Sequence, residues 1–157
     1  MAATTMEQIT LLIEKLKSKS PDVTFVAGDE FGWSPKTKTV TYSESSPELE
    51  AYLLHEYGHA LLDHDTYERD IDLIAMERDA WKTAQETASH YNLTIESGTI
   101  EDALDTYRDW MHARALCPAC DATGIETSKH EYTCIACRNR WHVNEARRCA
   151  LRRYTTK

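Results

Sequence analysis

The sequence LLHEYGHALLDH, residues 53–64, decides how the rest of the chain is interpreted. His55 and His59 are four residues apart, so in a helix their Cβ atoms lie on one face, roughly 5–6 Å from each other. Glu56 lies about 100° further around, close enough for its carboxylate to reach a water on a metal held by the two imidazoles. The leucines on both sides of the motif predict a buried helix, and buried His and Glu need partners. We therefore favour a metal site over a helix with ordinary solvated polar residues.

A third protein ligand has to come from outside this pair, and two candidates lie close by in the sequence. His64 follows His59 by five residues, and in a continuing helix that rotation carries it away from the histidine face. Asp65 follows by six, but Leu62 stands where a chain that turned back to the metal would place glycine. The sequence therefore disfavours both.

The third candidate, Glu77, belongs to a later segment with helical spacing. It is the charged member of an otherwise apolar stripe, formed by Ile74, Glu77, Trp81, Ala84 and Ala88. An unpaired buried carboxylate is costly, and coordination of the cation held by the two histidines removes that cost. The alternative is a surface ion pair of Glu77 with Arg78 or Lys82. We favour Glu77 as the ligand, because two histidines and a glutamate form a known catalytic zinc arrangement with one open position.

The motif HEYGHALL, followed by Glu77 with alanines three and seven residues later, resembles the gluzincin metallopeptidases. The similarity is strongest to the small ImmA/IrrE-like and minigluzincin types and covers roughly residues 20–95. It implies that His55, His59 and Glu77 bind a catalytic zinc and that Glu56 is the general base. It also implies an edge strand that aligns an extended peptide substrate, and TKTVTYS, residues 37–43, is the expected strand.

Two supporting roles remain open at this level. Asp63 lies four residues after His59 and either orients that imidazole or is an exposed acid at the end of the helix. A hydrolase of this kind also needs a donor for the developing oxyanion. The sequence offers several candidates for it: Tyr52, Tyr57, Tyr67, His64 and His90.

Hydrophobic periodicity and turn residues predict an α+β fold. Helices are expected over residues 6–17, from a cap at Ser46 through the motif, over about 67–91, and over about 99–116. Strands are expected at DVTFVAG, residues 22–28, and at residues 37–43, joined by the loop 29–36.

The segment CPACDATGIETSKHEYTCIAC has the spacing C-x2-C-x13-C-x2-C. This spacing is typical of a structural zinc held by four thiolates, here those of Cys117, Cys120, Cys134 and Cys137. Disulfides and rubredoxin-like iron are the alternatives. The segment resembles a zinc ribbon, with EYTC and RWHV as its expected strands, and the metal must supply much of its stability. Cys149 falls outside the pattern.

Charge is distributed unevenly along the chain. Residues 1–111 hold 9 Lys and Arg against 22 Asp and Glu, whereas residues 112–157 hold 9 against 4. The basic residues near the C-terminus alternate with Trp141 and Tyr154, a composition that suits phosphate contact and base stacking. They are Arg138, Arg140, Arg147, Arg148, Arg152 and Arg153. The alternative, of similar weight, is that this basic segment docks on the acidic part of the chain.

Taken together, the sequence predicts a zinc metallopeptidase-like domain over 1–114 and a zinc ribbon with a basic tail over 115–157. No apolar run is long enough to span a membrane and no signal peptide is recognisable, so a cytoplasmic protein is expected. The predicted function is that of a zinc endopeptidase with one catalytic and one structural zinc. Its water would be activated by the metal and by Glu56, and its ribbon would recruit a protein substrate or nucleic acid. The alternative is a non-catalytic or latent regulatory zinc protein that binds DNA or a protein partner through the ribbon.

Overall fold

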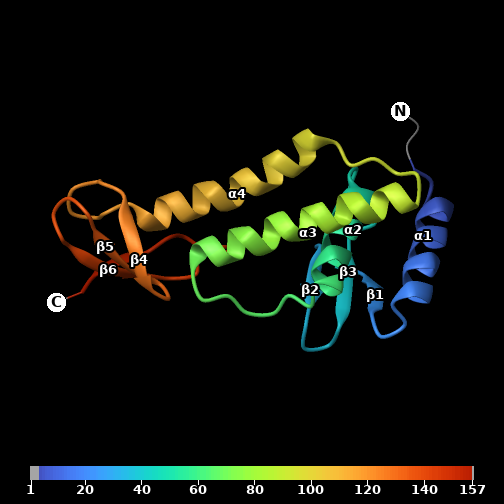
Figure 1. Ribbon diagram of the computed structural model, residues 1–157, viewed down its shortest axis with the longest axis horizontal. Coiled ribbons are helices and arrows are strands. Elements are labelled where there is room, and N and C mark those ends of the chain that lie inside the picture. Colours follow the sequence, from blue (N-terminus) through green and yellow to red (C-terminus); the bar gives the residue numbers. More distant parts are fainter. Residues whose placement is uncertain (1–3, 157) are drawn as a thin grey trace. The chain divides into compact units, whose positions relative to one another are not determined.

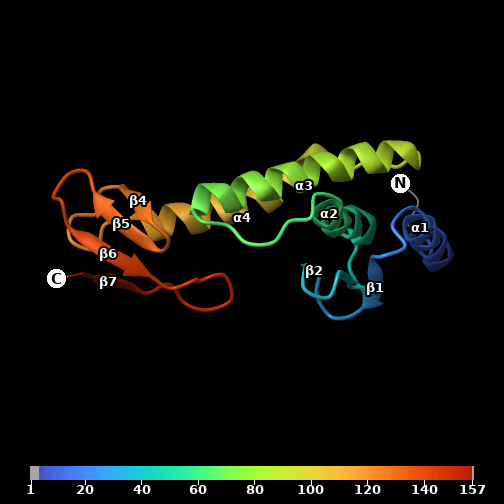
Figure 2. The same ribbon diagram turned by 60° about the horizontal axis from the view of Figure 1, so that its bottom comes forward.

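The computed structural model describes residues 4–156 and shows an α+β protein with helices and two separate sheets. The elements in chain order are α1 (Met6–Lys19), β1 (Thr24–Ala27), β2 (Gly32–Ser34), β3 (Thr39–Tyr42), α2 (Leu49–Leu61), α3 (Asp70–His90), α4 (Ser97–Ala115), β4 (Gly124–Ser128), β5 (Glu131–Cys134), β6 (Arg140–Val143) and β7 (Arg153–Thr155). Figure 1 labels all of them except β7, which is labelled in Figure 2. The contacts divide the chain into a first unit, Met1–Asp65 with Arg78–Glu96, and a second unit, Thr66–Glu77 with Ser97–Lys157.

The first unit contains a three-stranded sheet in the order β1-β3-β2. β1 pairs with β3 in parallel and β2 pairs with β3 antiparallel. Both predicted strands are present, but the loop predicted over 29–36 contains the additional strand β2. The expectation that TKTVTYS forms an edge strand is wrong, because β3 is the central strand and β1 and β2 occupy the edges. Three residues, GWS, are too few for alternation in the sequence to reveal a strand.

Helix α2 lies against β2 and β3, as Figure 1 shows, and approaches α3 closely at Gly58 and Ala80. Leu53 and Leu54 are fully buried in this layer. A Cβ atom built on Gly58 would lie 2.4 Å from the carbonyl oxygen of Ala80, closer than any real contact allows. Gly58 and the buried Ala80 are therefore the small residues that let the backbones of the two helices approach.

Both ends of α2 differ from the sequence prediction. The helix begins at Leu49 with Glu48 as its N-cap, and the Ser46 hydroxyl accepts a hydrogen bond from the Glu48 N–H before the helix starts. The helix ends at Leu61, and Asp63 adopts a left-handed conformation with φ 51°. Asp tolerates this conformation better than most residues with side chains, so the chain turns here without a glycine.

The second unit contains a four-stranded antiparallel sheet in the order β4-β5-β6-β7, visible in Figure 2. The predicted strands EYTC and RWHV are confirmed as β5 and β6, and the two outer strands were not predicted. Trp141 is fully buried and donates its indole N–H to the carbonyl of Arg114 over 3.1 Å. The proposed role of Trp141 in stacking on bases is therefore wrong. The core around it also contains Ala115, Cys117, Tyr132, Cys134 and Val143.

A buried ion pair holds α3 and α4 to this sheet within the second unit. Arg114, fully buried near the end of α4, donates to Asp70 through Nε at 2.8 Å and Nη2 at 3.2 Å. Tyr132 of β5 donates its hydroxyl to the same carboxylate, and Glu126 of β4 accepts from the Asp70 N–H. Asp70 is 2% exposed, so α3 begins inside this network.

No helix among the described residues is both long and apolar enough to cross a membrane.

Candidate metal centres

Helices α2 and α3 bring His55, His59 and Glu77 together. All three side chains are buried, and each offers one ligand atom within 4.8 Å of the other two. The Nε2 atoms of the two histidines are 3.2 Å apart. Two nitrogens on a tetrahedral zinc, each at about 2.0–2.1 Å from the ion, are separated by roughly 3.3 Å. The donor set therefore fits a small divalent cation.

The apolar stripe that singled out Glu77 is confirmed. Trp81, Ala84 and Ala88 are all buried on the same helix as Glu77. The Trp81 ring stacks on His55 with centroids 4.2 Å apart and planes inclined by 24°. Trp81 thus fixes the plane of this imidazole, which sequence periodicity alone had marked only as a core residue.

The second imidazole is oriented by His64, a role for which the sequence had offered Asp63 as one of two interpretations. His64 Nδ1 lies 2.8 Å from His59 Nδ1, the ring nitrogen opposite the one that faces His55. The His64 carbonyl accepts the indole N–H of Trp33 from β2 over 2.8 Å. Asp63 is exposed. The helix was expected to carry His64 away, but the turn at Asp63 returns it to His59, on the side away from the metal donors.

Glu56 is partly exposed on α2, directly after His55. The structure separates the candidates for oxyanion stabilisation by their surroundings. Tyr67 donates its hydroxyl to Glu145 within the second unit, and Tyr57 bonds Ser20. Tyr52 packs edge-on against Trp81 with centroids 5.4 Å apart, so it contacts the same tryptophan that stacks on His55.

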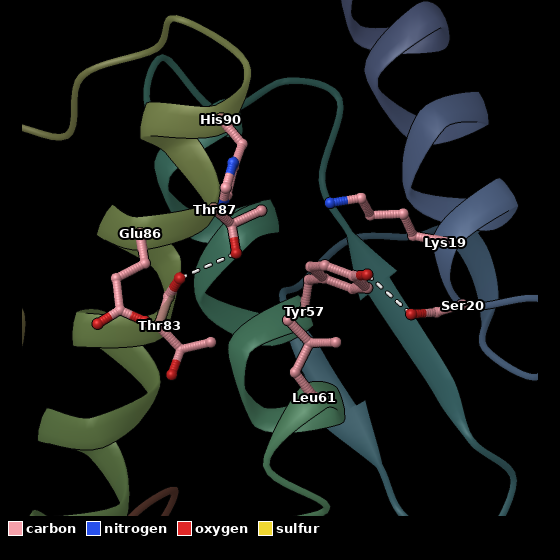
Figure 3. Close-up of a pocket in the computed structure, with 8 residues that line it drawn as sticks. All are labelled: Lys19, Ser20, Tyr57, Leu61, Thr83, Glu86, Thr87 and His90. Atoms are coloured by element: carbon pink, nitrogen blue, oxygen red, sulfur yellow. Dashed lines mark hydrogen bonds between the residues drawn. The ribbon is translucent and has the colours of Figure 1, made fainter.

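The opposite face of α2 carries a different pocket, shown in Figure 3. Its volume is about 330 Å³, and it is lined from α1, α2 and α3. The lining residues are Lys19, Ser20, Tyr57, Leu61, Thr83, Glu86, Thr87 and His90. The buried Tyr57 hydroxyl lies 2.8 Å from the Ser20 hydroxyl in this pocket. Tyr57 and His90 therefore belong to this face, and neither is placed to assist at the histidine pair.

The four predicted cysteines converge in the second unit. Sγ of Cys117 lies 3.7 Å from that of Cys137, and Sγ of Cys120 lies 3.5 Å from that of Cys134. Sulfur atoms on a tetrahedral zinc at about 2.3 Å from the ion are separated by roughly 3.8 Å. The fifth cysteine, Cys149, lies exposed outside this cluster. Among the described residues all five cysteines are free thiols, so the cluster is a candidate metal site and the disulfide alternative is not realised.

The loops around these cysteines are shaped to stabilise thiolates. Backbone N–H groups of Cys137 and Ala136 point at the Cys134 sulfur over 3.4 and 3.3 Å. The N–H of Cys137 is the largest influence, and together these bonds lower the pKa of Cys134 to about 6. The corresponding N–H of Ala119 points at Cys117 over 3.4 Å. Thiolates are the form that binds metal, so these N–H groups favour the ligand state at Cys117 and Cys134. At Cys120 the N–H of Ala122 acts in the same sense, but the neighbouring sulfurs of Cys134 and Cys137 outweigh it and raise the pKa to about 12.

Several residues that build these centres were missed from the sequence. Trp33 lies on the strand that was taken as loop. Arg114 and Asp70 are 44 positions apart, and each alone resembles an ordinary charged residue of a helix surface. The sequence held one local signal for the packing of α2 on α3, namely Gly58 within HEYGH. A glycine inside a helix suggests that another backbone approaches closely.

Comparison of the chain with models of known protein families, with characterised proteins and with solved structures gives no match.

Proposed function

We propose that the protein is a zinc-dependent endopeptidase. The observation that carries this proposal is the buried donor set of His55, His59 and Glu77, with Glu56 next to the first ligand on the same helix. Three protein ligands leave one position open, which is the arrangement of catalytic zinc sites. A purely structural zinc has a fourth protein ligand and needs no carboxylate beside the first histidine.

When bound in this donor set, zinc supplies a Lewis acid that lowers the pKa of water and polarises a carbonyl. Glu56 is the residue that takes a proton from the attacking water and returns it to the leaving amine. His64 and Trp81 hold the two imidazoles in their orientations, so that the ligands need little rearrangement.

For the substrate we propose an extended peptide that adds to the outer edge of β2. This strand is an edge of its sheet, it packs against α2, and its residue Trp33 bonds the His64 carbonyl. An added strand would bind through main-chain hydrogen bonds, which suits unstructured segments of many sequences. The four cysteines would hold a second, structural zinc that stabilises the small sheet around them.

The test is cleavage of an unfolded protein, such as reduced casein, by the zinc-loaded chain. Glu56→Gln is expected to retain both metals and the fold and to lower the rate by roughly 10²–10⁴-fold, the usual contribution of a general base. Glu77→Ala is expected to lose one zinc and keep the other. The exposed Glu86, which lines the pocket on the opposite face of α2, provides the matched control Glu86→Gln.

Unchanged turnover in Glu56→Gln would remove this residue as the base. If the wild-type chain binds two metals and cleaves no unfolded substrate, the alternative of a regulatory zinc protein becomes the better explanation. Metal analysis that finds one ion or none would contradict the two-zinc proposal itself.

A further inference from the structure

The sheet of the second unit has one face on the core and one face in solvent. Along β6, Trp141 and Val143 are buried, whereas Arg140 and His142, which alternate with them, are exposed. Alternate residues of a strand point to opposite faces, so the two exposed side chains share the solvent face. His142 pairs with Tyr154 of the neighbouring strand β7, which brings Tyr154 to the same face. Figure 2 shows β7 beside β6 at the edge of the sheet.

On this face two aromatic rings are already stacked. The rings of His142 and Tyr154 have centroids 4.9 Å apart and planes inclined by 21°. Tyr154 remains 44% exposed and lies on β7, the edge strand of the sheet. His142 covers one face of the phenol ring, and the exposed part of Tyr154 offers a surface on which a further flat ring can stack.

Three exposed arginines lie near this pair in the sequence: Arg140 and Arg152 stand two residues before His142 and Tyr154, and Arg138 lies in the loop that precedes β6. The side chains of Arg138, Arg140 and Arg152 are exposed and form no ion pair among residues 4–156. Residues 138–157 contain seven Lys and Arg and a single acid, Glu145. One acidic residue, Glu131 of β5, pairs with His142 and shares the solvent face. Its carboxylate accepts a hydrogen bond from the Ser128 hydroxyl over 2.7 Å.

Two other arginines of the basic segment have internal roles. The Arg147 guanidinium lies 3.8 Å from the centroid of the Tyr107 ring. Arg153 donates to the Leu116 carbonyl over 2.8 Å. The basic segment is therefore partly fastened to its own unit, which leaves a smaller and better defined charged surface than the sequence suggested.

We propose that this surface, formed by Arg138, Arg140, His142, Arg152 and Tyr154, binds single-stranded nucleic acid. The arginines would contact phosphates, and the exposed face of Tyr154 would stack on an unpaired base. A duplex offers the same phosphates but keeps its bases stacked on each other, so it cannot use the tyrosine ring. An acidic protein segment would use the arginines and leave the aromatic pair without a function. The proposal does not depend on peptidase activity.

The experiment measures binding of a fluorescein-labelled oligothymidylate to the full, zinc-loaded chain by fluorescence anisotropy over a series of salt concentrations. Tyr154→Ala is expected to weaken binding about tenfold, because stacking of one base contributes roughly 1–3 kcal/mol and 1.4 kcal/mol corresponds to a factor of ten. Tyr154→Phe keeps the ring and should bind like the wild type. Arg140→Gln and Arg152→Gln should each reduce the slope of log K against log salt by about 0.7.

The matched control is Arg108→Gln on α4, which should leave binding unchanged. Arg108 is also an exposed arginine, and its partners are Glu101 and Asp105. Zinc content measured for each variant separates loss of the fold from loss of binding, and the arginine variants test the surface even if Tyr154→Ala loses metal. Absence of binding at low salt would overturn the proposal. Equal affinity for a duplex together with no effect of Tyr154→Ala, or tighter binding of polyglutamate than of the oligonucleotide, would overturn it as well.

Discussion

Asp70→Ala is expected to destabilise the second unit by about 3–5 kcal/mol, the usual result of removing one partner of a buried ion pair. In the wild-type protein Arg114 is 0% exposed and directs two nitrogens at the Asp70 carboxylate, at 2.8 and 3.2 Å. Hydrogen bonds to charged groups contribute about 1.5–3 kcal/mol each, so losing two of them agrees with this range. The Tyr132 hydroxyl loses one of its two acceptors in the same variant and keeps Glu126. The carbonyls of Asn144 and Glu145 still accept from Arg114, which places the expected loss at the lower end.

The assay is urea unfolding at a fixed free zinc concentration, followed by near-ultraviolet circular dichroism. The double variant Asp70→Leu with Arg114→Met should recover most of the loss, because apolar side chains of similar volume remove the buried charge together with its partner. Asp105→Ala, which removes one of the two exposed partners of Arg108, should cost far less than Asp70→Ala. A loss below about 1 kcal/mol for Asp70→Ala, or a double variant as unstable as the single one, would refute the reasoning, since an uncompensated buried charge is its only source.

Three further outcomes are expected. His64→Ala should weaken zinc binding at the histidine pair by roughly 10–100-fold, the usual effect of losing an orienting partner. His64→Asn keeps a polar atom near the Nδ1 position and should restore part of the affinity. Zinc affinity is measured by competition with a chelator, and equal affinities of the variants and the wild type would contradict this role. Gly58→Ala should lower the unfolding midpoint, since a methyl group 2.4 Å from the Ala80 carbonyl oxygen must push the two helices apart. This separation costs about 1–3 kcal/mol, which exceeds the gain in helix propensity from glycine to alanine. A more stable variant would show that α2 and α3 separate freely. Burial, followed by the charge of Arg114, lowers the pKa of His130 against the smaller opposing effects of Glu145 and Asp70. The folded state therefore binds fewer protons than the unfolded state, and the free energy of unfolding should fall as the pH drops below about 6.5. His130→Asn should flatten this pH dependence in urea titrations, and an unchanged slope would exclude His130 as its source.

Most residues of both candidate centres could be predicted from the sequence because local spacing brings them together. His55 and His59 share a helix face by periodicity, and the cysteine pairs occur at the separation of two metal-binding loops. Glu77 was accessible for a different reason, as a charge within an apolar stripe. These inferences need only the period of a helix and the high free energy of an unpaired buried charge.

The features that escaped prediction depend on the tertiary fold. The short strands β2 and β7 are ordered by their neighbours, and their three residues carry no periodic signal. The role of Trp141 was wrong because a tryptophan between arginines is compatible with either face of a strand until the register is known. The turn at Asp63 was missed because aspartate reaches a left-handed conformation often enough to replace glycine there.

The network around Arg114 has a consequence for how this chain can be divided and recombined. Arg114 donates to the carbonyls of Asn144 and Glu145 and contacts the ring of His130, and Asp70 accepts the hydroxyl of Tyr132. These four partners all come after the end of α4 in the sequence. A protein cut after residue 114 would keep both members of the ion pair and lose the surroundings that shield them from water. The cysteine-bearing sheet is thus no detachable accessory that could be exchanged between proteins at the end of a helix. A fragment that lacks this sheet should expose the Arg114 guanidinium and the Asp70 carboxylate, which are buried in the intact chain, and should be less stable than the intact chain.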